Sequence, residues 1–343
     1  MMTIEDFVAG MPKAENHIHQ DGATSPQSAL VLAQKHQMSL PFRTPEEADS
    51  LFRYQNLGEF IRIIDSVNAV IQTEDDIVYL LIELGRDAAR QNIRYREIML
   101  ANDFHERMGL SLDGQMRGFV RGKEAAKALF GVEFACIPEI DRTMDPKKSA
   151  EYPERLAPWR EKANIVAIGL ESAEAGFPAH LHRQAFQNAR AMGYPITSHA
   201  GEACGAESIW DSLESIGSTR IDHGVRAVED PALMEYLAKH RILLTVCPHS
   251  NLSLQVFPDM EHHSIVQLMQ AGIPVSINSD DPPFFRADLN KNYVDVVRTF
   301  RLDKKQLLAI AENAFVYSYA PQNVIASAVR ELHVYFETHD YTL

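Results

Sequence analysis

Eight short runs of apolar residues recur along this chain, and segments with helical periodicity separate them. The runs lie at residues 13–19, 93–100, 131–140, 165–171, 195–202, 219–224, 242–248 and 274–281. Apolar strands that alternate with helices are typical of a parallel sheet whose two faces are both covered. Because about 250 residues in eight βα units is the usual size of a closed (β/α)8 barrel, the pattern predicts an α/β fold of this kind, a TIM barrel with extra N-terminal and C-terminal helices. An open doubly wound sheet is the alternative, but the first run lacks the GxGxxG turn that would support it.

The composition predicts one domain, residues 1–343, because no low-complexity tract and no Gly/Ser-rich linker interrupts the chain. The formal net charge of −14 argues against nucleic acid or an anionic membrane as a partner. No apolar run approaches the roughly 20 residues of a membrane span, and the acidic N-terminus does not resemble a signal peptide. The three cysteines form no CxxC pair, so a disulfide framework is not expected. These features predict a cytoplasmic protein.

Polar side chains collect at the ends of four of the predicted strands. The first run ends in His17, His19 and Asp21, the fifth in His199 and Glu202, the sixth in Asp222 and His223, and the eighth in Asp280 and Asp281. A lone buried histidine, or an Asp-Asp pair before prolines, is more often structural than functional. In a barrel, however, the C-terminal strand ends meet at the face that carries the active site. The coincidence at four strand ends therefore predicts one shared site.

Histidines together with a carboxylate favour a Zn²⁺ site with one position open for water. Bound zinc lowers the pKa of that water to roughly 7, which makes it a nucleophile near neutral pH. The sequence lacks the rival zinc motifs HExxH, paired CxxC, and H-x-E with P-C-x-x-C. These residues predict metal-assisted hydrolysis with one zinc ion per chain.

Five stretches of the sequence resemble the adenosine deaminase family of amidohydrolases, in the family's order. They are "MPKAENHIHQDGA", "SHAGEACGAES", "RIDHGVRAVEDPALMEYL", "LLTVCPHSNLSL" and "VSINSDDPPFF". The resemblance covers nearly the whole chain and implies a (β/α)8 barrel that deaminates a 6-aminopurine with one catalytic zinc. It further implies that the zinc is held by His17, His19, His199 and Asp280.

The resemblance also assigns the remaining catalytic and substrate-binding positions. Glu202 would donate a proton to purine N1, and His223 would orient and deprotonate the attacking water. Asp281 would hydrogen-bond purine N7, and Asp21 would contact the 5′-hydroxyl of a nucleoside. The alternative for Asp21 is that it caps the following loop. Helical residues Leu57, Phe60 and Ile61 are expected to cover the purine, or else to be only the core face of an amphipathic helix.

The resemblance leaves two candidate substrates, which correspond to two branches of this family. Asp21 favours adenosine or 2′-deoxyadenosine, which is the main prediction, with inosine or 2′-deoxyinosine and ammonia as products. The stretch "GLESAEAG" instead resembles adenine deaminases, because it places Ser172 where adenosine deaminases have a glycine whose N–H meets purine N3. Free adenine or a modified 6-aminopurine is therefore the alternative substrate.

Gln20 and Asp222 depart from the family pattern, and two other classes of protein must also be considered. Gln20 stands where the family has leucine and Asp222 where it has glycine, with effects that the sequence leaves open. A binuclear amidohydrolase would need a lysine on the fourth strand, and "NIVAIGLE" has none. A purine-binding protein without activity would be expected to lose a ligand or the acid, and this chain keeps them all. The oligomeric state is left open.

Overall fold

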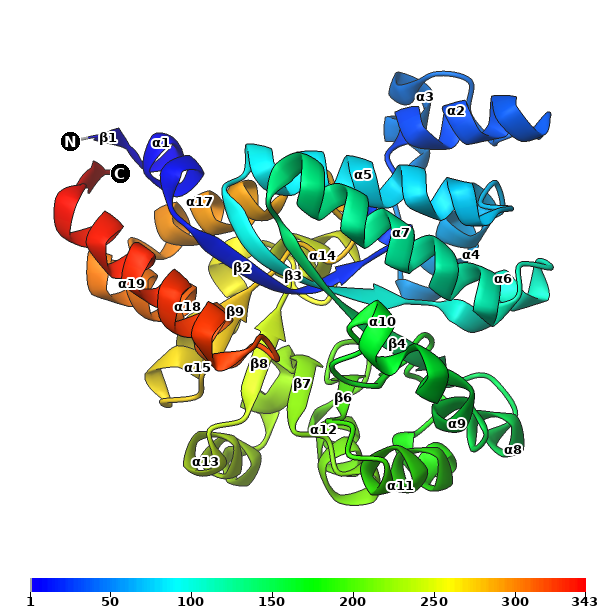
Figure 1. Cartoon of the computed structure of the whole chain (residues 1–343). Coiled ribbons are helices and arrows are strands. Elements are labelled where there is room, and N and C mark those ends of the chain that lie inside the picture. The colour runs from blue at the N-terminus through cyan, green and yellow to red at the C-terminus, as the bar shows by residue number, and fades with distance from the viewer. Residues whose placement is uncertain (1) are drawn as a thin grey trace.

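Eight parallel strands form a closed barrel in the computed structural model, which describes residues 2–343 (Figure 1). Four of them make one sheet in the order β2-β3-β4-β5, and the other four make a second sheet in the order β6-β7-β8-β9. Single bridges join the two sheets at both seams, Ile168 to Ile196 and Ile18 to Asp280. The strands are β2 (Lys13–His19), β3 (Ile93–Leu100), β4 (Glu133–Asp141), β5 (Gly169–Glu171), β6 (Thr197–Ala200), β7 (Arg220–His223), β8 (Leu243–Val246) and β9 (Val275–Ile277). The predicted (β/α)8 architecture is confirmed.

Helices surround the barrel on its outer face. The longer ones between and after the strands are α5 (Glu74–Arg90), α7 (Leu112–Phe130), α11 (Arg183–Ala191), α13 (Pro231–His240), α17 (Leu289–Phe300) and α18 (Lys304–Val316). Shorter ones are α6 (Asn102–Arg107), α8 (Pro146–Ser149), α9 (Tyr152–Leu156), α10 (Arg160–Ala163), α12 (Ala206–Asp211), α14 (Pro248–Ser253), α15 (Ile265–Gln270) and α16 (Pro282–Phe285). Most lie in the connections between strands, as βα units require.

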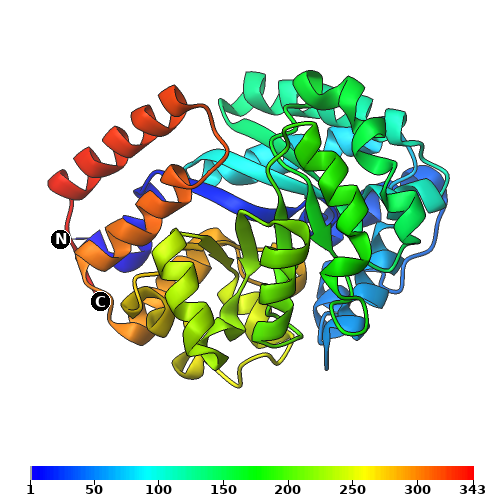
Figure 2. The same ribbon diagram turned by 90° about the horizontal axis from the view of Figure 1, so that it is seen from below.

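The expected extra helices lie at both ends of the sequence. Helix α1 (Ile4–Gly10) precedes the first barrel strand, and α2 (Pro26–His36), α3 (Pro45–Leu51) and α4 (Leu57–Asn68) gather beyond the end of β2 (Figure 1). The long C-terminal helix α19 (Gln322–Thr338) runs along α18 on the outside (Figure 2). The two short strands β1 (Met2–Thr3) and β10 (Tyr341–Thr342) pair with each other, which ties the two termini together.

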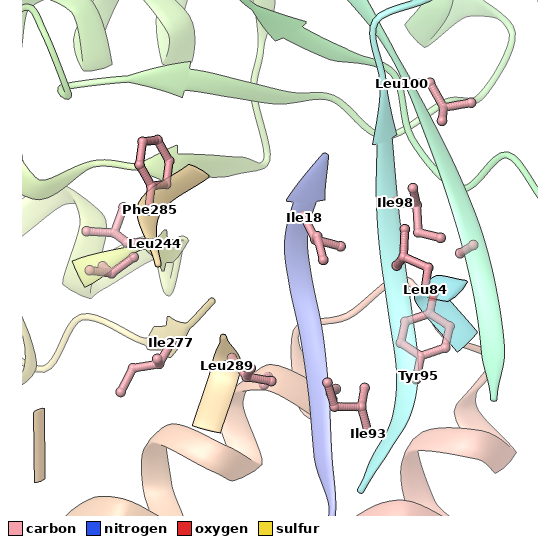
Figure 3. Close-up of a cluster of buried hydrophobic side chains, with 14 of the residues drawn as sticks. Ile18, Leu84, Ile93, Tyr95, Ile98, Leu100, Leu244, Ile277, Phe285 and Leu289 are labelled. Carbon is pink, nitrogen blue, oxygen red and sulfur yellow. The ribbon is translucent and has the colours of Figure 1, made fainter. Parts of the chain in front are cut away.

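The alternation of side chains along the strands separates two environments. His17 and His19 share one face of β2, so Ile18 between them points to the other face. Ile18 is buried in the main apolar core, together with Ile98 of β3 and Leu84 of α5 (Figure 3). This outward face packs the barrel against its helices and leaves the inward face free for polar side chains.

Buried charged side chains lie on both faces of the strands below the strand ends, since Arg96 faces helix α5, where it also donates to Leu84 O, and Arg220 faces the barrel interior. Arg96 of β3 donates from Nε to Glu15 Oε2 at 2.6 Å, and both side chains are fully buried. Arg220 of β7 pairs in the same way with Glu97 of β3. Barrel interiors are more often packed with branched apolar residues. Such buried pairs hold only when each charge has its partner, because a lone buried charge is costly.

Two further sequence predictions concern membranes and cysteines. Within residues 2–343, every helix is too short or too polar to cross a membrane. Cys136, Cys204 and Cys247 are all free thiols, as the cysteine spacing predicts.

Candidate active site

Three residues at strand ends adopt the left-handed backbone conformation that non-glycine residues seldom take. They are Ser172 just after β5, His223 at the end of β7 and Asp280 after β9, with φ values of 78°, 64° and 65°. Each such residue costs about 1–3 kcal/mol and tends to occur at functional sites. A left-handed residue breaks the strict alternation of a strand. Consecutive residues such as Asp280 and Asp281 can therefore both face the same pocket.

His17, His19, His199 and Asp280 come together at the C-terminal end of the barrel. One ligand atom from each lies within 4.8 Å of the others. Asp280 Oδ1 is 3.2 Å from His17 Nε2 and 3.3 Å from His19 Nε2. The Nε2 atoms of His19 and His199 are 3.2 Å apart. The four residues come from β2, β6 and the end of β9, so the barrel itself sets their geometry.

The outer hydrogen bonds of these histidines leave their Nε2 lone pairs free. Leu170 O, which can only accept, lies 3.1 Å from His199 Nδ1. Thr245 donates its hydroxyl to Asp222 Oδ1 at 2.8 Å and so accepts from His17 Nδ1 at 3.0 Å. Each Nδ1 therefore carries the proton, and the buried His17 Nε2 has no hydrogen-bond partner within residues 2–343. Two converging lone pairs, the adjacent Nε2 of His19 and a carboxylate fit the donor set of zinc.

A second chain of hydrogen bonds orients His223. Ile265 N donates to His263 Nδ1 at 3.1 Å, so His263 Nε2 carries the proton and donates to Asn251 Oδ1 at 3.1 Å. The Asn251 amide nitrogen then faces His223 Nδ1 at 3.4 Å. This leaves the N–H of His223 on Nε2, which points toward Glu202 Oε1 at 3.6 Å and Asp280 Oδ2 at 3.9 Å. Burial lowers the pKa of His223 to about 3, so its imidazole is neutral.

Glu202 sits on a loop that another carboxylate holds in place. Glu174, itself buried, accepts the backbone N–H groups of four consecutive residues, Gly201 (2.7 Å), Glu202 (3.2 Å), Ala203 (2.7 Å) and Cys204 (2.7 Å). Burial raises the pKa of Glu202, and the nearby Asp280 and Glu174 carboxylates raise it further. A carboxyl group that keeps its proton in this way can act as an acid.

A pocket opens beside these residues and contains every substrate-binding position expected from the sequence. Its lining includes Asp21, Ser172, Asp281, Leu57, Phe60 and Ile61. The last three come from α4, which places an apolar helix face over the histidine cluster. Further apolar lining that the sequence analysis did not single out comes from Ile64, Phe104, Leu254 and Phe285. With its open mouth the pocket has about 790 Å³ of empty space, a usual size for a small-molecule site.

Asp21 has a partner that no local sequence pattern indicates. Nε2 of His105, on α6, lies 2.9 Å from both carboxylate oxygens of Asp21. Both side chains are buried, Asp21 being 7% exposed. His105 lies 84 positions further along the chain, so only the fold brings it to the end of β2. The contact fixes the orientation of the Asp21 carboxylate in the pocket.

Gly22 makes room for Asp281 in the same pocket. A Cβ atom at position 22 would lie 1.6 Å from Asp281 Oδ1, so no larger residue fits without moving that carboxylate. The glycine that comes after the histidine motif is therefore needed for close packing of the first and last strand ends.

The lining of the pocket is rich in acidic side chains. Asp65, Asp141 and Glu171 join Asp21 in this lining, and the one cation among the described lining residues is Arg107. Arg107 already pairs with Asp103 and lies 3.6 Å from Asp141. Burial and the neighbouring Asp21 raise the pKa of Asp65 to about 6. Such a lining favours neutral or cationic ligands over phosphates.

Comparison with known proteins gives the class of enzyme that the sequence resemblance implies. The adenosine deaminase family matches residues 12–333. An adenine deaminase from Hahella chejuensis is 31% identical over 336 residues, which cover 98% of this chain and 100% of that protein. An aminodeoxyfutalosine deaminase from Streptomyces avermitilis is 34% identical and covers 97% of this chain and 93% of its own length.

Solved structures extend the likeness to three dimensions. Adenine deaminase from Arthrobacter aurescens superposes with a TM-score of 0.92 at 28% identity, over 96% of this chain and 100% of that one. An amidohydrolase from Burkholderia ambifaria, solved with bound Zn, has the same fold, with a TM-score of 0.86 at 24% identity over 97% of this chain and 94% of its own.

This chain belongs to the adenosine deaminase family, and it is a hydrolytic deaminase of adenine-type purines. The main sequence prediction, adenosine as substrate, fits less well than its alternative, because several relatives across the whole chain are adenine deaminases. The prediction placed too much weight on Asp21 as a contact for ribose. A carboxylate at that position is equally able to accept an N–H group from a bare purine ring.

Replacing Glu174 with Gln should disturb the loop that carries Glu202. The amide has one acceptor oxygen instead of two, and its NH2 group would face backbone N–H donors. We expect kcat to fall about ten- to a hundredfold, since a hydrogen bond to a charged group contributes about 1.5–3 kcal/mol. Steady-state kinetics and metal analysis would measure this, with the metal retained. The control is Glu207→Gln, because Glu207 accepts a single N–H, that of Gly205. Equal effects of both substitutions would contradict the prediction.

Proposed function

We propose that this enzyme hydrolyses free adenine, or a closely related 6-aminopurine base, to the 6-oxopurine and ammonia with one zinc ion per chain. The observation that carries the reaction is the convergence of three histidine Nε2 atoms and Asp280 beside Glu202. The choice of a base over a nucleoside is supported by the adenine deaminases among its relatives.

His17, His19, His199 and Asp280 would hold the zinc ion. When bound, zinc lowers the pKa of a water molecule and so supplies the nucleophile for attack on C6 of the purine. Within the chain, Thr245 and Leu170 keep Nδ1 of His17 and of His199 protonated. That arrangement directs both Nε2 lone pairs toward the cluster without cost at the time of binding.

Two residues would move or hold protons during the reaction. Glu202 gives a proton to purine N1 as the C6–O bond forms, and it regains one from the attacking water. The C6–N bond then breaks, and the amino group leaves as ammonia with the proton of the new C6 hydroxyl group, which becomes the 6-oxo group. His223, with its N–H on Nε2, donates a hydrogen bond to the oxygen that attacks C6. The hydrogen-bond chain through Asn251 supports this orienting role over the proton-accepting role expected from the family resemblance.

The pocket would recognise the purine through its ring nitrogens. Asp281 hydrogen-bonds N7, and the backbone N–H of Ser172 meets N3. A free base carries an N–H on its imidazole ring where a nucleoside carries the sugar. The Asp21 carboxylate, oriented by His105, can accept that N–H. Leu57, Phe60 and Ile61 cover the ring and exclude water, which strengthens the electrostatic contacts below them.

Replacing His19 with Ala should remove metal and activity together, because a catalytic zinc ion has few protein ligands to lose. Elemental analysis should give one zinc per wild-type chain and close to none in the variant. His333→Ala is the control, since that imidazole is exposed and pairs with Glu312. Two zinc ions required for activity, or a fully active His19 variant, would reject the mononuclear site.

Replacing Glu202 with Gln should leave zinc in place and abolish most turnover, because the amide keeps the shape of the side chain but cannot deliver its proton. General acid–base groups contribute about 10²–10⁴ in rate, and kcat should fall within that range. Ammonia release and metal content measured on the same preparation test this. Normal turnover would mean that another group is the acid.

Adenine should be deaminated far better than adenosine, 9-methyladenine or AMP. The 9-methyl compound is decisive, because it lacks the ring N–H without adding a sugar. Asp21→Ala should lower kcat/KM for adenine at least about tenfold, the equivalent of ~1.4 kcal/mol, and change the 9-methyladenine value little. Asp65→Asn is the control in the same pocket. If Asp21→Ala instead impaired adenosine alone, Asp21 would be a sugar contact.

A further inference from the structure

Glu139, near the end of β4, has no assigned role and an unusual environment. Its side chain is fully buried, and neither carboxylate oxygen has a hydrogen-bond partner within the described part of the chain. A buried carboxylate without partners is strongly unfavourable in a native protein. Its position therefore needs an explanation that lies in its surroundings.

The nearest donors to this carboxylate are two of the histidines of the cluster. Glu139 Oε2 lies 3.5 Å from His19 Nδ1, and Oε1 lies 3.5 Å from His199 Nδ1. His199 Nδ1 already has Leu170 O at 3.1 Å. The acceptors near His19 Nδ1 are two carboxylates, Glu139 at 3.5 Å and Glu171 at 3.7 Å. Of these two, Glu139 is the closer and the more deeply buried.

The neighbouring strand is shaped to admit Glu139. Gly169 of β5 pairs in register with Glu139, and a Cβ atom at position 169 would lie 2.4 Å from Glu139 Oε1 and 2.7 Å from its Cγ. Gly169 has ordinary backbone geometry, so the backbone itself would tolerate a larger residue there. The glycine thus leaves space for this carboxylate beneath the histidines.

We propose that Glu139 is the positioning residue for His19, accepting the proton of its Nδ1 and so directing its Nε2 lone pair at the metal. This inference rests on the proposed metal site. The three histidines then have three different outer acceptors, Thr245 for His17, Leu170 O for His199 and Glu139 for His19. Of these three acceptors, Glu139 alone can carry a negative charge, which beside a bound cation would make the attached imidazole a stronger donor and offset the charge of the cation.

The same atoms could be read as a second cation site, because ligand atoms of His19, Glu139 and Glu171 lie within 4.8 Å of one another. His19 would then have to bind a cation through each ring nitrogen and lose both ring protons. Neutral imidazole is the usual metal ligand, so the hydrogen-bonded arrangement is favoured.

The test compares metal affinity in four full-length proteins: wild type, Glu139→Gln, Gly169→Ala and Asp141→Asn. Glu139→Gln removes the charge at nearly constant shape, and Gly169→Ala displaces the carboxylate but keeps its charge. Asp141→Asn is the matched control, a carboxylate on the same strand that accepts from the backbone N–H and the hydroxyl of Thr143. Zinc dissociation constants come from competition with a chelator, and Co²⁺ substitution reports the ligand field by its visible spectrum.

We expect the zinc dissociation constant to rise about 10–100-fold in Glu139→Gln and in Gly169→Ala, with a shifted Co²⁺ spectrum and little change in Asp141→Asn. If the first variant fails to fold, Gly169→Ala decides alone. Wild-type affinity and spectrum in both would overturn the positioning role while leaving the metal site intact. Two metal ions per wild-type chain, one of them lost in Glu139→Gln, would also overturn it. A wild-type protein that binds no zinc would instead reject the proposed function.

Discussion

The pairing of the first and last barrel strands is the contact on which this active site depends. His19 N donates to Asp280 O at 3.1 Å, and Asp280 N donates to His17 O at 3.2 Å. These two hydrogen bonds close the barrel, and they join the three residues whose side chains meet at Asp280 Oδ1. Closure of the barrel at this seam therefore brings three of the four cluster residues together, and His199 of β6 supplies the fourth. The left-handed backbone of Asp280, which costs free energy, is held by the same two bonds.

Buried ion pairs lie beneath this cluster, one against helix α5 and one inside the barrel. Glu15 pairs with Arg96, Glu97 pairs with Arg220, and Arg220 Nε lies 3.3 Å from Asp222. Asp222 in turn accepts from Thr245, which holds His17. Buried ion pairs add little net stability, but they tolerate few alternative arrangements. The ion pairs around Arg220 thus support the orientation of His17 through Asp222 and Thr245.

Local pattern in the sequence was sufficient to predict the strands and the position of the site. The apolar runs located all eight strands, and the strand-end positions of His17, His199, Glu202 and Asp280 pointed to one shared pocket. Contacts that depend on the register between strands could not be predicted in this way. The sequence left the effect of Asp222 open, and in the fold this residue supports His17 through Thr245. Glu174 and His105 carried no signal at all, because one is a carboxylate in an ordinary loop and the other a single helical histidine.

The substrate, too, could be predicted only in part from the local sequence. Asp21 on its own favoured a nucleoside, since a carboxylate can accept a ribose hydroxyl. In the fold, both of its oxygens face His105, and its neighbours in the pocket lining are Asp65, Asp141 and Glu171. Every one of these carboxyl groups is an acceptor when ionised, so the pocket favours a ligand with hydrogen-bond donors and repels phosphate. A bare 6-aminopurine supplies a ring N–H at the end remote from C6, and its flat apolar faces match the cover of Leu57, Phe60 and Ile61. Under the proposed function, the pocket would select adenine by the N–H that its ring donates, and a sugar at that position would remove the donor.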